Sequence, residues 1–219
     1  MSSYDLARII IWIGLFVLVS GPVHECAHAY AAWRLGDGTA KMFGRVSLDP
    51  IRHFDPVGGT LLIASIVLSG GNYGFGWAKP TPVNPFNLRG RYADTIVSVA
   101  GPLSNLALAA VFAVGFRILW ANGETLPDNS SGINMLQLVF WEGVQLNVVL
   151  MLFNLLPVPP LDGSHVLLDL LDPKTAQSAR VFFAQYGLFL LLPVVFLAGQ
   201  IIRPILNPIL SALIGLPLG

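Results

Sequence analysis

Two histidines and a glutamate in the stretch GPVHECAHAY, residues 21–30, follow one another in the order H-E-x-x-H. Residues four apart share one face of a helix, so His24 and His28 can direct their rings at a single cation. Glu25 lies close enough to act on a water at that cation without binding it. Zinc hydrolases use this spacing with the glutamate as general base. The pattern therefore predicts a zinc site with Glu25 as the catalytic base.

The third ligand must come from elsewhere in the chain, because catalytic zinc takes three protein ligands and keeps one position open. Asp162, in NLLPVPPLDGSH, is the favoured candidate, since it follows the inner end of a membrane segment at a depth similar to that of the two histidines. His165 is the rival ligand, and a plain helix-capping turn is the other reading of this LDG sequence. His53 falls in a polar loop, where an interfacial or structural role fits better. Cys26 points away from the histidine face of its helix.

The composition indicates an integral membrane protein. Of the 219 residues, 54% are hydrophobic and only 11% are charged, against about 25% charged in an ordinary globular domain. The net charge of zero argues against a nucleic-acid partner. The single cysteine excludes an internal disulfide.

The apolar segments predict an all-α polytopic membrane protein, with about 4–6 membrane segments in one domain over residues 1–219. A helix needs about 20 residues to cross ~30 Å of hydrocarbon. The stretch 57–69 is short for a crossing, so we expect a re-entrant hairpin over 57–71. Pro204 and Pro208 break the apolar tail 204–218, and its crossing stays open. The long apolar segments lie at residues 6–35, 93–121, 133–156 and 181–202.

The loop charges predict which side of the membrane each loop faces. Lysines and arginines occur in the loops 34–56 and 72–92 and in the loop after the segment 133–156, but not between residues 121 and 133. The positive-inside rule places the first three loops in the cytoplasm. This arrangement requires the stretch 57–71 to enter and leave on one side. The N-terminus is then outside, and the site lies toward the cytoplasmic side.

HECAH followed by NLLPVPPLDG resembles the site-2 protease family of intramembrane zinc metalloproteases, in its compact prokaryotic form without a PDZ or CBS domain. Three further stretches match, LGDGTAKMFGRVSLDPIRHFDPVGG, GFGWAKPTPVNP and AGPLSN. The resemblance implies His24, His28 and Asp162 as the ligands of one Zn²⁺ per chain, and Glu25 as the catalytic base. It also implies that Asn154 lies at the active site and binds the substrate backbone or stabilises an oxyanion. By its own chemistry Asn154 is a buried amide, for which a structural role is equally open.

The expected function is hydrolysis of peptide bonds in or near transmembrane segments by a zinc-activated water. The partners would be a transmembrane protein substrate and the lipid bilayer, and the location a prokaryotic cell membrane. A zinc transporter would need ligands outside, where only Glu124 and Asp128 stand. An inactive scaffold is disfavoured because all four metal-chemistry residues are present. Hydrolysis of a lipid ester stays open, and the oligomeric state is not indicated.

Two other stretches have predicted positions near the site. AGPLSN, with Gly101, Pro102 and Asn105, is expected to pack the segment 93–121 closely against the segment 6–35 and to take no catalytic role. The stretch 57–71 and the proline-rich loop 77–87 are candidates for a substrate-binding strand or a gate, and a surface loop is the alternative.

Overall fold

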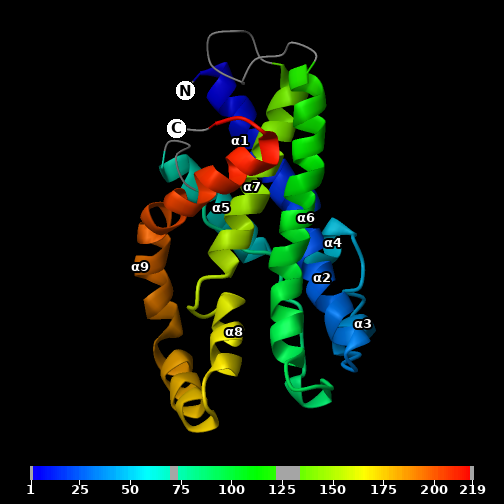
Figure 1. The fold of residues 1–219 in the computed structure, drawn as a ribbon, viewed down its shortest axis with the longest axis vertical. Coiled ribbons are helices and arrows are strands. Elements are labelled where there is room, and N and C mark those ends of the chain that lie inside the picture. The colour runs from blue at the N-terminus through cyan, green and yellow to red at the C-terminus, as the bar shows by residue number, and fades with distance from the viewer. Residues whose placement is uncertain (1, 70–73, 122–133, 218–219) are drawn as a thin grey trace.

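The computed structural model describes residues 2–69, 74–121 and 134–217, and over these residues the chain is helical without strands (Figure 1). Glu124 and Asp128, the outer-loop acids of the sequence analysis, fall outside the described residues. The elements in chain order are α1 (Ser3–Leu15), the π-helix η1 (Phe16–Ser20), α2 (Gly21–Arg34), α3 (Thr39–Met42), α4 (Pro50–His53), α5 (Pro56–Leu68), the 3₁₀-helix η2 (Pro85–Asn87), α6 (Ala93–Ala121), α7 (Met135–Asn154), α8 (Gly163–Leu170) and α9 (Pro173–Ile214).

Within these ranges, 4 helical stretches are long and apolar enough to cross a membrane. This confirms the predicted all-α, polytopic architecture. The stretches are Ser3–Arg34, Ala93–Ala121, Met135–Asn154 and Phe189–Ile214.

A single helical rod of 32 residues carries the H-E-x-x-H stretch, with a π-helical turn in its middle. Pro22 has no backbone N–H and its ring would collide with the preceding turn of a regular α-helix. The wider π turn accommodates this, and the Gly21 N–H donates to the Phe16 carbonyl five residues back. A Cβ on Gly21 would lie 2.9 Å from that carbonyl oxygen, which is why glycine stands there.

Residues 56–69 and 74–77 lie against each other as two arms, at the place where the re-entrant hairpin over 57–71 is predicted. Helix α5 has only 13 residues, too few for a crossing. From residue 74 the chain has no regular secondary structure and lies along α5, where Phe75 N–H donates to Ser65 Oγ at 2.8 Å. Gly58 lies against Trp77, and Lys79 N–H donates to the His53 carbonyl at 2.7 Å. The returning chain thus reaches the level at which α5 began, so both ends of the hairpin lie on one side.

The apolar core lies between α6, α7 and the end of α9. Phe116, Val144 and Val148 are fully buried there, together with Leu210 and Ile214 from α9. Figure 1 shows α9 rising along one side of the molecule and then bending so that its last part lies across α7.

The expected break at Pro204 is wrong, because α9 continues through Pro193, Pro204 and Pro208 to Ile214. Each proline removes one backbone hydrogen bond. Burial of the final turns against α6 and α7 offsets this loss. The Arg117 guanidinium also donates to the Ala212 carbonyl at 2.9 Å, so the end of α9 is fixed to α6.

Asp37 ties the end of α2 to the chain that returns from the hairpin. Its side chain is fully buried and accepts from Thr39 N–H and Oγ, from Asn84 N–H at 2.7 Å and from the Asn87 amide at 3.0 Å. Burial alone would raise the pKa of the Asp37 carboxyl, but these hydrogen bonds lower it below its ordinary value of 3.8. The carboxylate therefore stabilises the fold above that pH, and this contribution is lost as the pH falls through the lower folded value.

We expect Asp37→Asn to destabilise the protein, because all four groups around Asp37 are donors and an asparagine NH₂ would face some of them. Leaving such groups unpaired costs about 1–3 kcal/mol, which lowers the melting temperature by roughly 2–10 °C for a chain of this size. Thermal unfolding in detergent at neutral pH measures the change. Asp49→Asn is the control, since asparagine caps a helix as well as aspartate does. Equal melting of the Asp37 variant and the parent would contradict this account.

Candidate metal centre

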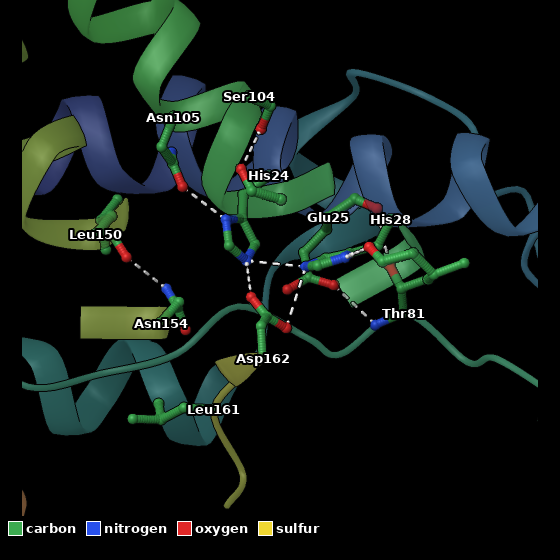
Figure 2. A network of polar contacts seen from close by, with 12 residues as sticks. His24, Glu25, His28, Thr81, Ser104, Asn105, Leu150, Asn154, Leu161 and Asp162 are labelled. Carbon is green, nitrogen blue, oxygen red and sulfur yellow. Dashed lines mark hydrogen bonds and ion pairs between the residues drawn. The ribbon is translucent and has the colours of Figure 1, made fainter. Parts of the chain in front are cut away.

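Three side chains from distant parts of the sequence converge at one point. His24 Nε2 and His28 Nε2 lie 3.0 Å apart. Asp162 Oδ2 is 3.3 Å from His24 Nε2, and Asp162 Oδ1 is 3.4 Å from His28 Nε2. Figure 2 shows the Asp162 carboxylate pointing toward both rings. Among the described residues this is the group whose ligand atoms could hold a metal ion.

The spacing of these atoms fits zinc. Tetrahedral zinc with bonds of about 2.0 Å separates its ligand atoms by about 3.3 Å, and the three separations in this structure lie close to that value. The buried Asp162 Oδ2 also has no hydrogen-bond partner within the described chain. A buried carboxylate oxygen without a hydrogen-bond donor is costly unless a cation is nearby.

The opposite edge of each imidazole is fixed by α6. His24 Nδ1 lies 2.6 Å from Asn105 Oδ1, and His28 Nδ1 lies 2.7 Å from the Val97 carbonyl. An amide oxygen and a carbonyl can only accept, so each Nδ1 must carry the proton. In the neutral imidazole Nε2 is then the unprotonated nitrogen, which can bind a metal, and this is the arrangement of outer partners common at histidine metal sites.

Glu25 lies beside the cluster and is held by the chain returning from the hairpin. Thr81 N–H donates to Glu25 Oε2 at 2.8 Å, and Thr81 Oγ donates to the Glu25 carbonyl at 2.9 Å. The two bonds fix the side chain and the backbone of one residue at once (Figure 2). The predicted base is therefore next to the predicted ligands and is not one of them.

Comparison with known proteins identifies the family. The model of peptidase family M50 matches residues 10–197. The chain belongs to peptidase family M50. This confirms the expected site-2 protease type, and the chain is a zinc metalloendopeptidase and a multi-pass membrane protein.

Three relatives carry matching names. A Bacillus subtilis (strain 168) protein named "Putative zinc metalloprotease YwhC" is 40% identical over 199 residues, covering 90% of this chain and 86% of that protein. "Putative zinc metalloprotease Rip2" of Mycolicibacterium smegmatis is 33% identical over 214 residues, covering 93% of this chain and 73% of that protein. The protein of the same name in Mycobacterium tuberculosis (strain H37Rv) is 34% identical over 197 residues, covering 85% of this chain and 69% of that protein. No solved structure matches the chain.

Asn154, the other predicted site residue of this M50 peptidase, ends α7 near the metal centre. Its amide nitrogen donates to the Leu150 carbonyl at 2.9 Å, one turn back in the same helix. Figure 2 shows its side chain on the same side of the site as Asp162. The structure does not make Asn154 a member of the ligand cluster, and its role stays a prediction.

The two remaining histidines have partners of other kinds. His165, the rival ligand, places Nδ1 at 3.1 Å from Asp94 Oδ2 and lies outside the ligand cluster. This hydrogen bond raises the pKa of the His165 imidazole. His53 is buried and its Nε2 lies 2.7 Å from the Ser47 carbonyl, in keeping with the structural role expected for it.

The AGPLSN stretch has one role that was expected and one that was missed. A Cβ on Gly101 would press against His28 Nε2 and lie 2.6 Å from His24 Cε1, so the predicted close packing is found. Asn105, in contrast, orients a ligand and is itself held by Asn147 Oδ1 at 3.0 Å. The available signal was the spacing, since residues 101 and 105 share one helix face and a buried amide in a membrane needs partners.

We expect Gly101→Ala to weaken zinc binding at least tenfold, because the new methyl group would occupy the position of the ligand rings. Zinc affinity, measured in detergent by competition with a chromophoric chelator, tests this. Gly14→Ala is the matched control, since a Cβ there meets nothing within 4 Å. Parent-like affinity in the Gly101 variant would show that the α2–α6 contact does not shape the site.

Proposed function

We propose that this zinc metalloendopeptidase cleaves peptide bonds in or near transmembrane segments of membrane proteins. One zinc per chain would be held by His24, His28 and Asp162, with Glu25 as general base. The observation that carries the proposal is the place of the ligand cluster. His24 and His28 lie inside a helix long and apolar enough to span a membrane, against another such helix. Ionisable groups at that depth are costly and are usually functional.

The bound zinc would act as a Lewis acid that activates water and polarises the scissile carbonyl. Glu25 would accept the water proton at its carboxylate and later deliver it to the leaving amine. Thr81 supports this by fixing one Glu25 oxygen and so restricting the side chain to one orientation. Asn105 and the Val97 carbonyl accept from Nδ1 of His24 and His28, and so favour the neutral tautomer in which Nε2 is the ligand atom.

The substrate must unwind before it reaches Glu25, because a helix hides its peptide groups in internal hydrogen bonds. The stretch from Trp77 to Asn84, which has no regular secondary structure, contacts Glu25 through Thr81. We therefore infer that this stretch borders the path of the unwound substrate. The loop charges favour a site that opens toward the cytoplasm.

Glu25→Gln should keep one zinc per chain and abolish cleavage, because glutamine is not a ligand here and cannot accept the proton. Asp162→Ala should lose both zinc and cleavage. The assay uses purified protein in detergent, a model substrate with one transmembrane segment and a zinc chelator, and Asp172→Asn is the control at an exposed helix cap. Cleavage by the Glu25 variant would contradict the proposed base. Equal cleavage of a soluble unstructured peptide would contradict the proposed substrate class.

We also propose that Asn154 binds the substrate backbone or the developing oxyanion, supported by its place at the end of α7 beside the site. Loss of one such donor costs about 10²–10³ in kcat. Asn154→Ala is therefore expected to lower kcat with zinc content unchanged. Steady-state cleavage and metal analysis of the same preparation measure both quantities. A parent-like kcat would leave Asn154 with the structural role only.

A further inference from the structure

The position of Asp162 depends on α8. Asp162 is the residue that precedes α8, yet its side chain makes no capping hydrogen bond to that helix and points to the histidines instead. The linker before it folds tightly, since a Cβ on Gly163 would press on the backbone of Leu155. A shift or rotation of α8 would therefore move the Asp162 carboxylate directly.

Helix α8 has only eight residues, so it is too short to be stable alone and must be held by its neighbours. Two side chains of α8 reach the first turn of α6. His165 Nδ1 lies 3.1 Å from Asp94 Oδ2, and Asp169 Oδ2 accepts from the neighbouring Thr95, at 2.6 Å from Oγ and 3.2 Å from N–H.

These two links lie one turn apart on one face of α8, because residues 165 and 169 are separated by four positions. Two attachment points fix the rotation of a short helix as well as its place. Asp169 also sits at the N-terminal end of α6, where a negative charge is stabilised by the free N–H groups and the helix dipole. Helix α6 is the element that also fixes His24 and His28.

We propose that His165 and Asp169 are positioning residues for the metal centre: they fasten α8 to α6 and so hold the Asp162 carboxylate at ligand distance from the two histidines. This inference rests on the proposed zinc site. Neither residue is itself a ligand. Helix α6 would then fix the positions of all three ligands, His24 and His28 directly and Asp162 through α8.

The test measures zinc affinity of the full chain in detergent. His165→Ala and Asp169→Ala are each expected to weaken zinc binding 10–100-fold, as loss of an outer partner of a metal ligand does. Asp169→Asn keeps an oxygen that can accept from Thr95, so it should retain most of the zinc affinity. Thr95→Val removes the hydroxyl donor and should weaken zinc binding, whereas Thr95→Ser keeps that donor and should not. The control is Leu170→Ala, on the same helix and 76% exposed, with parent-like affinity expected.

A double-mutant cycle separates positioning from ligation. If His165 acts through Asp94, then Asp94→Ala should weaken zinc binding as much as His165→Ala, and the double variant should be no worse than either. The absorption spectrum of the cobalt-substituted His165→Ala protein should also keep the parent's shape, because no ligand is lost. A changed cobalt spectrum, or parent-like zinc affinity in both alanine variants, would overturn the inference. A parent that binds no zinc would instead refute the proposed function, and this inference with it.

Discussion

Two imidazoles from α2 lie against the bare backbone of α6 at Gly101, and the rest of the molecule is arranged around this contact. The rings can meet there only because no side chain occupies the space. The same helix supplies the groups that hold their outer nitrogens, Asn105 and the Val97 carbonyl. It also receives the two links from α8, so the carboxylate arrives opposite the rings. One helix, α6, thus contacts the parts of the chain that carry all three ligands, although these ligands lie almost 140 residues apart in the sequence.

Placing this chemistry among membrane-spanning helices is costly, and the structure shows how the cost is limited. A polar group without a partner in such surroundings costs several kcal/mol. The outer nitrogen of each histidine is paired, Asn105 is paired with Asn147, and Asn147 donates to the Gly143 carbonyl. The unpaired Asp162 Oδ2 is thus left where a cation would sit. The irregular chain that carries Thr81 and Asn84 also needs hydrogen-bond partners, and Glu25 and Asp37 provide them at two points.

Much of this could be predicted from the sequence, because lipid imposes simple rules of length and polarity. The bounds predicted for α6, 93–121, are those observed, and the short length of α5 with the charges around it indicated the hairpin. The convergence of His24, His28 and Asp162 followed from helical spacing and from the order of crossings. The details that were missed depend on long-range packing. Helix α9 continues past Pro204 because its end is buried against α6 and α7. No local sequence pattern indicates that α8 binds α6 or that Thr81 binds Glu25.

X-ray absorption spectroscopy of the zinc-loaded protein tests the central claim most directly, namely that two imidazoles of α2 and the carboxylate of Asp162 form one metal site. The account predicts scattering from two histidine rings, together with light ligands at about 2.0 Å and no sulfur. The Asp162→Ala protein should show a reduced number of light ligands or no bound zinc. A third imidazole around the metal, or a sulfur at about 2.3 Å from Cys26, would contradict the account.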